Sequence, residues 1–395
     1  MKRLLPLLAA IIFALTARAA SPVTVTLVNV YPGSDIYELE GHSALRLTGA
    51  DGDFAVSWGQ FDFNAPNFVY RFVKGETDYS VALIPWAYFE NAYIRQGRRM
   101  VGHVIDMDST QTAALLEFVA RNLEPANRIY RYNYVKDNCA TRPLRALEAA
   151  FGDSIALGPA VVESESSFPV TFRNVMRRYH ANYPWYQFGI DLALGSGIDY
   201  PLSRREMAFA PVVMDSQLAE ATVGGRPLVK SVQVLADFPP ENAVLAPTPW
   251  YLSPMFVCWL VFTLILTVCI ADVRRGCTSR AVQAVYFGIE GLAGCLLTFL
   301  IFVSVHEATS PNWLYVWLNP LCLIPTIFIW LNKCKSLVLS WQFANFVLLF
   351  TMCVLWPWLP QSANPAFLPL VLASMVLSAS YIKVNYPNDK NTTRK

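Results

Sequence analysis

One cysteine stands apart from the others as a candidate nucleophile. Of the eight cysteines in the 395 residues, only Cys139 lies before residue 258, and the others fall in or between apolar runs near the C-terminus. A thiol without a disulfide partner in an exported domain is either buried as a small apolar side chain or used for chemistry. Because the stretch from Tyr132 to Arg142 is polar, both interpretations of Cys139 stay open.

The residues after Cys139 predict a helix. Thr141 to Phe151 has helical spacing, Pro143 fits only a first turn, and Gly152 ends the segment. Backbone amides at a helix N-terminus stabilise a thiolate, lower the pKa of a thiol and can bind an oxyanion. The helix therefore favours a reactive Cys139.

Asp137 and Asn138, just before the cysteine, could either cap this helix or help to position an oxyanion. Tyr134 and Arg142, in the same stretch, are candidates for contacts with a substrate.

A cysteine nucleophile needs a base, and three histidines precede the C-terminal apolar runs. His42 opens a predicted strand after Gly41, where a small residue lets a partner approach. His103 alternates like an ordinary strand residue, and His180 follows two arginines and a tyrosine, which suggests a surface or membrane-facing position. We therefore choose His42, and we expect its ring to approach the Cys139 sulfur within hydrogen-bonding reach.

Residues on the neighbouring predicted strand could orient His42. Ser57, Gln60 and Asp62 lie on or just after that strand, and the sequence does not choose among them. Arg46 and Arg142 could hold a lipid phosphate, although solvated surface charge is the commoner fate of such residues.

The elements around these residues are of mixed type. Alternating apolar residues predict strands at 23–30, 42–47 and 54–58, whereas 109–123 has helical spacing with Ser109 placed to cap it. The fold class is therefore α+β, and about 230 residues are enough to bury a core.

The rest of the chain predicts export and a membrane. Residues 1–19 have the charged, apolar and small-residue order of a signal peptide, and a proline-rich linker at 236–251 separates an exported domain at 21–235 from a transmembrane region at 252–382. A cytoplasmic tail follows at 383–395. Five apolar runs long enough to span a bilayer lie at 252–271, 282–305, 314–331, 338–356 and 366–382.

Charge sets the expected orientation and excludes one class of partner. Lys and Arg residues follow the first, third and fifth runs and are absent from the other two loops, which places the N-terminal domain outside the cytoplasmic membrane and the C-terminus inside. With 31 basic and 29 acidic residues, the chain lacks the basic surplus that nucleic-acid binding requires.

Two polar residues in the apolar region are candidates for function. Glu290 lies inside the second run, where a carboxylate either serves function or forms a packing hydrogen bond near glycines. His306 ends that run on the outer side, where it could contact a lipid head group.

Three motifs together resemble a known family. Gly41–Arg46, Trp58–Phe63 and Tyr132–Arg142 resemble the lipoprotein N-acyltransferases of the Bacteroides type (Lnb type), and the likeness continues through Pro184–Gly189 and into the spans. The order of a histidine strand before a cysteine helix is also similar to the circularly permuted papain-like fold of NlpC hydrolases and lecithin:retinol acyltransferases (LRAT). The resemblance implies a permuted papain-like domain followed by an all-α five-helix transmembrane bundle.

The family resemblance also implies an activity. A phospholipid would donate an acyl chain to Cys139, with His42 as base, and the thioester would pass the chain to the N-terminal cysteine amine of a diacylated lipoprotein. Because the ester of a phospholipid lies just beneath its head group, this activity requires a thiol that faces the membrane. We expect no metal or nucleotide cofactor, since neither ligand spacing nor a phosphate-binding glycine loop is evident.

Two other functions fit the same residues. The Cys139 and His42 pair could hydrolyse its thioester with water, as a thiol phospholipase or a cell-wall amidase. Alternatively, the chain could be a non-enzymatic lipid-binding membrane module, which a buried Cys139 far from His42 would favour.

Overall fold

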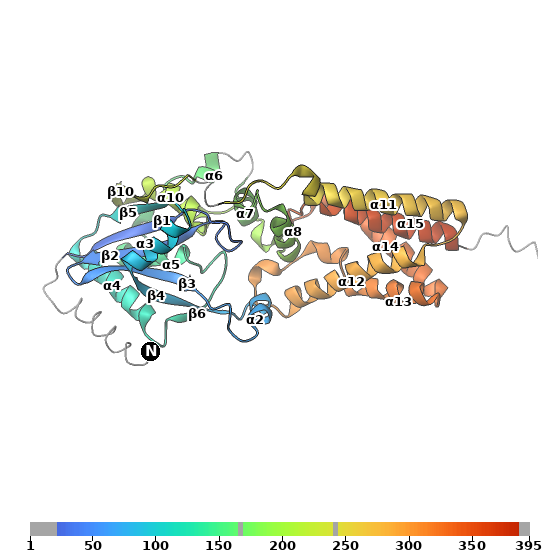
Figure 1. Ribbon diagram of the computed structural model, residues 1–395, viewed down its shortest axis with the longest axis horizontal. Helices are drawn as coiled ribbons and strands as arrows, with labels where there is room; N and C mark the ends of the chain where they lie inside the picture. Colours follow the sequence, from blue (N-terminus) through green and yellow to red (C-terminus); the bar gives the residue numbers. More distant parts are fainter. Residues whose placement is uncertain (1–21, 165–168, 240–243, 387–395) are drawn as a thin grey trace, which may run out of the picture. The chain divides into compact units, whose positions relative to one another are not determined.

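The computed structural model describes residues 22–164, 169–239 and 244–386, so the predicted signal peptide lies outside the described residues (Figure 1). The chain forms two compact units. The first, here called the sheet unit, comprises Met1–Asn182 and Tyr200–Ala246, and the second, the helical unit, comprises Tyr183–Asp199 and Pro247–Lys395.

A seven-stranded antiparallel sheet forms the centre of the sheet unit (Figure 1), with the strand order β10-β5-β1-β2-β3-β4-β6. The strands predicted at 23–30, 42–47 and 54–58 correspond to β1, β2 and β3 and are confirmed. The seven strands are β1 (Thr24–Val30), β2 (His42–Gly49), β3 (Gly52–Gln60), β4 (Asp78–Pro85), β5 (Met100–Ile105), β6 (Ile129–Arg131) and β10 (Val229–Ala236).

A second, three-stranded sheet is much smaller, with β7 (Ile155–Ala156), β8 (Thr222–Val223) and β9 (Arg226–Pro227). Eight helices belong to the sheet unit within the described residues: α2 (Phe68–Lys74), α3 (Trp86–Arg95), α4 (Ser109–Leu123), α5 (Thr141–Phe151), α6 (Val161–Ser164), α7 (Phe172–Tyr179), α9 (Arg204–Met207) and α10 (Pro211–Ala219).

Alternation along the strands divides the core between the two faces of the large sheet. On β2, Leu45 and Leu47 pack with residues of α4, α5 and α10, whereas Ala44 packs on the opposite face with Trp86 and Phe89 of α3. His42 has the same parity as Ala44, so it lies on the α3 face. The two cores fix β2 and β3 from both sides, which holds the residues at their ends in place.

The α4 and α5 helices lie where the sequence predicts them. Asp108 caps α4 by accepting hydrogen bonds from the N–H groups of Thr110 and Gln111, both at 2.8 Å. The Gln111 side chain in turn accepts from the Asp108 N–H, so the cap is Asp108 and not, as expected, Ser109. The α5 helix begins two residues after Cys139 and ends at Gly152, as predicted.

The helical unit contains five helical segments long and apolar enough to cross a membrane, and they correspond to the five predicted runs. They are Pro254–Arg275 (α11), Arg280–Phe302 (α12), Trp313–Leu331, Lys335–Trp358 and Phe367–Asn385 (α15). The fourth consists of helix α14 (Lys335–Leu355) and the 3-10 turn η8 (Trp356–Trp358). The third is broken into the 3-10 turns η6 (Trp313–Val316) and η7 (Pro320–Cys322) and helix α13 (Leu323–Leu331). The observed mixture of a sheet-rich domain and spanning helices confirms the α+β class.

One segment groups differently from the boundaries drawn on the sequence. The predicted exported domain is continuous over 21–235, but Tyr183–Asp199, with α8 (Pro184–Ala193) and the 3-10 turn η2 (Ser196–Ile198), forms part of the helical unit. Asp191 of α8 is fully buried and accepts a hydrogen bond of 2.9 Å from Asn364. Buried polar side chains need such partners, and Asp191 finds one in the transmembrane half of the chain, which hydropathy does not reveal.

Candidate functional site

Cys139 lies at the ends of strands β2 and β3 and is buried, with an exposed fraction of 9%. The backbone N–H of Ser43, at the start of β2, donates a hydrogen bond to its sulfur, and the Tyr132 hydroxyl lies 3.8 Å from the same atom. Gly59 of β3 has φ +89°, and a Cβ there would stand 3.4 Å from the Cys139 Cβ. The thiol therefore lies one residue from His42 along β2 and beside the end of β3.

The protonation of this thiol differs from the sequence-based expectation. Burial raises the pKa of Cys139, and the hydrogen bonds from Tyr132 and Ser43 oppose that shift without reversing it. The amides expected to stabilise a thiolate are already bonded, because Asn138 Oδ1 accepts from the Ala140 and Thr141 N–H groups, each at 2.9 Å. In this closed site the thiol is neutral at rest.

His42 carries a hydrogen bond that fixes its ring. Its Nε2 lies 2.8 Å from Ser57 Oγ, and Gln60 Nε2 donates to the same hydroxyl oxygen at 3.0 Å. The imidazole packs 6.2 Å from the ring of Tyr93, nearly parallel to it, and 6.3 Å from Phe89. Of the three residues considered for orienting His42, Ser57 contacts the ring and Gln60 supports Ser57.

The charge state of His42 follows from its surroundings. Burial, and secondarily the positive charge of Arg98, lowers the pKa of His42 to about 3. A neutral imidazole can accept a proton, so this ring is in the form that a general base requires, although its affinity for the proton is weak in the closed site.

Arg98 is a residue that the sequence did not single out. Its side chain is 1% exposed, pairs with Glu38 at 2.7 Å and donates from Nε to the Tyr31 carbonyl at 2.8 Å. Its guanidinium lies 4.9 Å from the ring centroid of Tyr93, which also packs on His42. Its Nη2 has no partner among the described residues. Next to it in sequence, Arg99 is 35% exposed, and nothing in the local pattern distinguishes the two.

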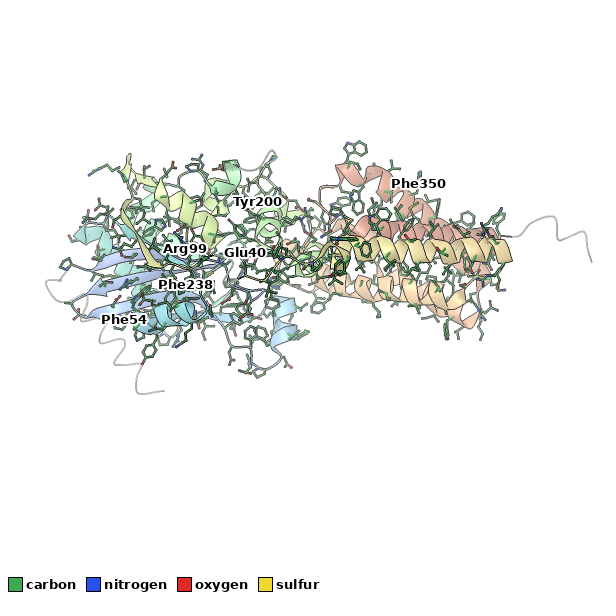
Figure 2. All side chains as sticks on the ribbon, turned by 45° about the horizontal axis from the view of Figure 1, so that its top comes forward. Glu40, Phe54, Arg99, Tyr200, Phe238 and Phe350 are labelled. Atoms are coloured by element: carbon green, nitrogen blue, oxygen red, sulfur yellow. The ribbon has the colours of Figure 1, made fainter. Side chains whose placement is uncertain are left out.

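The other two histidines of the sheet unit are buried and paired with carboxylates. His103 Nε2 lies 2.7 Å from Asp215 Oδ1, and His180 Nε2 lies 2.7 Å from Glu40 Oε1 (Glu40 is labelled in Figure 2). The expectation of a surface or membrane-facing His180 is wrong, since its side chain is completely buried at the C-terminal end of α7. A basic and aromatic local sequence cannot report that Glu40, 140 residues away, lies beside it.

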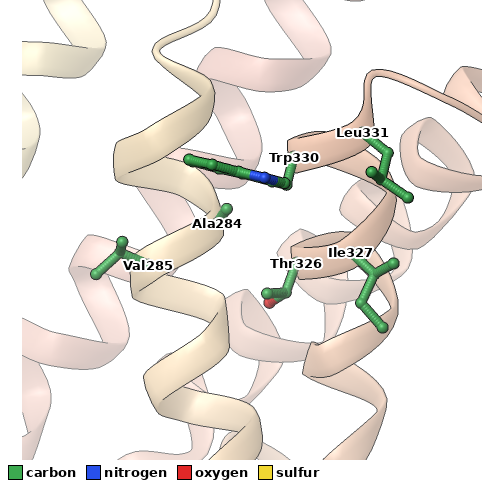
Figure 3. Close-up of a pocket in the computed structure, with 6 residues that line it drawn as sticks. All are labelled: Ala284, Val285, Thr326, Ile327, Trp330 and Leu331. Carbon is green, nitrogen blue, oxygen red and sulfur yellow. The ribbon is translucent and has the colours of Figure 1, made fainter.

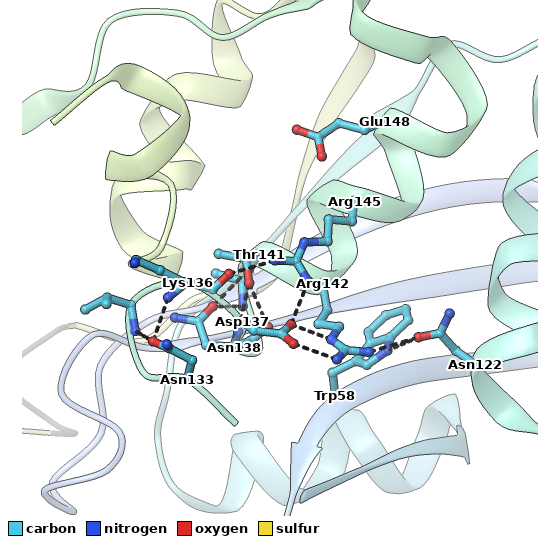
Figure 4. A network of polar contacts seen from close by, with 12 residues as sticks. Trp58, Asn122, Asn133, Lys136, Asp137, Asn138, Thr141, Arg142, Arg145 and Glu148 are labelled. Atoms are coloured by element: carbon cyan, nitrogen blue, oxygen red, sulfur yellow. Dashed lines mark hydrogen bonds and ion pairs between the residues drawn. The ribbon is translucent and has the colours of Figure 1, made fainter. Parts of the chain in front are cut away.

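The polar residues around Cys139 form a network of their own (Figure 4). Asp137 accepts two hydrogen bonds from Arg142, at 2.5 and 2.7 Å, and a third from Arg145 at 2.8 Å. Asn138 donates to the Tyr134 and Phe209 carbonyls at 2.7 and 2.9 Å. Both ends of the Asn138 amide are thus engaged in holding the turn, and the Arg142 charge is already neutralised by Asp137.

The remaining candidates of the sheet unit have structural contacts. Arg46 forms a two-point ion pair with Asp53 at 2.6 and 2.8 Å, and its guanidinium lies 4.1 Å above the Trp86 ring. Tyr134 packs 6.5 Å from Phe209, while Tyr132, two residues earlier, reaches the Cys139 sulfur. Asp62 is exposed and accepts from the Asn64 N–H at 2.8 Å, which is a local turn contact.

In the helical unit, Glu290 is buried within α12. It accepts hydrogen bonds from Trp317 Nε1 at 2.5 Å and from Ser374 Oγ at 3.1 Å. These contacts join α12 to the third and fifth spans, so they are helix-packing hydrogen bonds, the second of the two expectations for this residue. His306 lies in the loop after α12, where its carbonyl accepts from Thr309.

An apolar recess on the helical unit is lined by none of the candidate catalytic residues. It has a volume of about 420 Å³ and is lined by Ala284, Val285, Thr326, Ile327, Trp330 and Leu331 from α12 and α13 (Figure 3). Its residues lie within spanning segments, where lipid chains surround such surfaces. Within residues 22–164, 169–239 and 244–386, no group of three or more His, Cys, Asp or Glu side chains is arranged to hold a metal ion.

Comparison with known protein families agrees with this architecture. The family model described as the Lnb N-terminal periplasmic domain matches residues 14–178, and the model described as the Lnb transmembrane domain matches residues 246–389. Neither a curated protein nor a solved structure matches the chain. The two matches cover most of the sequence in the order that the two units require, so the chain belongs to the Lnb family of multi-pass inner-membrane proteins with a periplasmic domain, in the context of membrane lipoprotein processing.

Proposed function

We propose that this protein is a lipoprotein N-acyltransferase that uses Cys139 as nucleophile and His42 as base. The acyl donor is a membrane phospholipid, and the acceptor is the α-amino group of a diacylated lipoprotein's N-terminal cysteine. The observation that carries the proposal is the hydrogen bond from the Ser43 N–H to the Cys139 sulfur, one residue from an imidazole whose Nε2 contacts Ser57.

The first half of the reaction forms a thioester. His42 Nδ1 accepts the Cys139 proton as the sulfur attacks the ester carbonyl carbon, and the ester C–O bond then breaks. His42 returns the proton to the departing lysophospholipid oxygen. Ser57 acts through His42, because a Ser57 oxygen that accepts from Nε2–H leaves the Nδ1 lone pair for the thiol. The approach of Nδ1 to the sulfur within hydrogen-bonding reach stays a prediction.

The second half consumes the thioester. The neutral amine of the lipoprotein attacks the thioester carbonyl, the C–S bond breaks, and the amine proton passes through His42 to the departing sulfur. The unperturbed pKa of an α-amine, about 8, leaves part of it neutral at neutral pH. A thioester also has a better leaving group than the original oxygen ester.

The uncharged state of Cys139 and His42 at rest affects how the reaction begins. Burial disfavours both the thiolate and the imidazolium, so proton transfer from Cys139 to His42 is uphill in the closed site. The same burial keeps water from the sulfur, which favours transfer to an amine over hydrolysis. We propose that the site opens when lipid binds, and that the charges form only around the bound ester.

The proposed orientation of the chain in the membrane rests on the distribution of positive charge. Lysine and arginine residues in the loops after the first, third and fifth spans orient the sheet unit toward the periplasm and the C-terminus toward the cytoplasm. A catalytic unit joined to spanning helices meets lipid-anchored substrates at a high local concentration.

Mass spectrometry of the purified full chain with phospholipid and no acceptor tests the reaction. We expect an acyl adduct on Cys139 that hydroxylamine removes, and no adduct in Cys139→Ala. An adduct on another residue would contradict the site, and free fatty acid without transfer to a diacylated peptide would establish a hydrolase instead.

The burial of Cys139 is the observation that favours the second candidate, a non-enzymatic lipid-binding membrane module. The contacts of the sulfur with Ser43 and Tyr132 favour an enzyme, because a merely structural thiol needs no hydrogen-bond donors. A Cys139→Ala variant that keeps full function in cells would establish the binding module.

A further inference from the structure

The sheet unit carries an exposed apolar patch outside its core. We define the aromatic patch as Ile36, Tyr37, Phe63 and Val69, with exposed fractions of 51%, 52%, 56% and 74%. Tyr37 and Phe63 contact each other at 5.6 Å, and Phe63 contacts Phe68 at 5.2 Å, so residues from two loops and α2 meet. Large apolar side chains gathered on a surface in this way mark an interaction site.

A continuous series of rings joins this patch to the thiol. Phe63 lies 4.6 Å from Phe61, Phe61 lies 5.1 Å from Tyr79, and Tyr79 stacks on Tyr132 at 4.2 Å. The Tyr132 hydroxyl then lies 3.8 Å from the Cys139 sulfur. The exposed fraction falls from 56% at Phe63 to 9% at Tyr79 and Cys139, so the rings lead from solvent to the buried thiol.

The charges beside the patch are paired with one another. Arg71 bonds Asp78 at 2.7 Å and Lys74 bonds Glu76 at 2.8 Å, while Arg131 lies 3.6 Å from Asp78. The three cations share two anions, Asp78 and Glu76, so most of the charge is neutralised and the surface suits apolar groups. Aromatic side chains favour the boundary between lipid tails and head groups, and this chain carries five spans that keep the sheet unit at a bilayer.

We propose that the aromatic patch docks on the bilayer and leads one phospholipid acyl chain along the rings of Phe61, Tyr79 and Tyr132 to Cys139. This inference rests on the proposed acyl transfer for its final step, but the docking itself does not. The group that binds along these rings is a lipid acyl chain, because the surface is aromatic and ends at the sulfur that would attack an ester.

Photo-crosslinking of the full chain in phosphatidylcholine nanodiscs tests the docking without reference to activity. Benzoylphenylalanine replaces Phe63 in one protein and Val232 in a control, since Val232 is 54% exposed on the edge strand β10. We expect at least several-fold more lipid adduct at position 63. Equal adducts at the two positions, or crosslinks from position 63 only to protein, including the chain's own helical unit, would overturn the proposal.

The rate of acyl-enzyme formation tests whether the rings guide an acyl chain from the aromatic patch to Cys139. The Phe63→Ser/Val69→Ser variant is compared with Val232→Ser/Val234→Ser, which removes two exposed valines from β10. We expect the first variant to acylate about tenfold more slowly from bilayer phospholipid, and normally from a short-chain, water-soluble thioester. The control variant should match wild type with both donors.

The outcomes separate the two proposals. If the Phe63→Ser/Val69→Ser variant acylated at an unchanged rate from bilayer phospholipid, or lost rate equally with both donors, the proposed path of the acyl chain would be overturned. Wild-type protein that acylates with neither donor would overturn the proposed transferase, while the crosslinking result would still decide whether the patch docks on lipid. High salt should not reduce the lipid adduct at position 63, because paired charges do not drive this docking.

Discussion

The sheet unit contains two histidine environments of opposite character. His103 lies 2.7 Å from Asp215, which also accepts a hydrogen bond from the Tyr31 hydroxyl at 2.8 Å. His42, in contrast, has a neutral hydroxyl as partner and lies near the positive charge of Arg98. A carboxylate partner holds His103 in a structural contact, whereas the hydroxyl beside His42 leaves that ring neutral and able to take a proton.

The same comparison explains why residue type alone was a weak guide. All three histidines of the sheet unit have a polar partner at 2.7 or 2.8 Å. Only His42 adjoins a residue that bonds a cysteine sulfur, through Ser43. The candidate base is therefore distinguished by its neighbour on β2, and it is also less deeply buried than His103 and His180.

The largest expected effect comes from removing the nucleophile. Cys139→Ala should lower acyl transfer by at least about a thousandfold, because no other group can form the thioester. The measurement is the rate of acylation of a diacylated lipopeptide by full-length protein in nanodiscs. Cys258→Ala, in the first span, serves as a cysteine control and should acylate normally.

Removing the base should have the next largest effect on rate. His42→Ala should lower acyl transfer by roughly a hundredfold to ten-thousandfold, as expected for loss of general acid–base catalysis. If His42→Ala retained activity while His103→Gln lost it with its fold intact, the assignment of the two histidines would be reversed.

His103→Gln should affect stability instead. It leaves the Asp215 carboxylate without its closest buried partner, at a cost of about 3 kcal/mol in the free energy of unfolding. Thermal unfolding of the full chain measures this loss, and the activity per folded molecule should stay close to wild type. A normal melting temperature would show that the His103 and Asp215 pair is not structural.

Ser57→Ala should lower the rate of acyl transfer about tenfold, because His42 loses the partner that fixes its tautomer. Ser57→Thr, which keeps a hydroxyl, should recover part of the rate. Ser80→Ala on β4 is a suitable control, since within the part of the chain that the structure describes its hydroxyl donates only to the Gln60 carbonyl, at 3.4 Å.

The smallest effect concerns pH. Because His42 must be neutral to act and its pKa is lowered to about 3, acyl transfer should persist well below the ordinary histidine pKa of about 6.5. Arg98→Gln removes a charge that disfavours imidazolium, so it should raise the pKa of His42 and move the acid limb to higher pH by less than about one unit. An acid limb near 6.5 in wild type would contradict a neutral His42 with a lowered pKa.

Local patterns predicted much of the fold and the chemically distinctive residues. Period-two alternation located β1, β2 and β3, helical spacing located α4 and α5, and five long apolar runs located the spans, because each signal lies within one segment of the chain. The choice of Cys139 and His42 rested on residue type and order, and their catalytic roles remain predictions.

The tertiary structure alone decided how the site residues are used. Tyr134 was the tyrosine predicted to contact a substrate, yet Tyr132 is the one that reaches the sulfur. The local pattern also did not distinguish buried Arg98 from Arg99. It also predicted a lowered thiol pKa from the helix start, whereas burial raises that pKa. Burial and pairing depend on contacts between residues far apart in the chain, such as His180 with Glu40, and no local pattern encodes them.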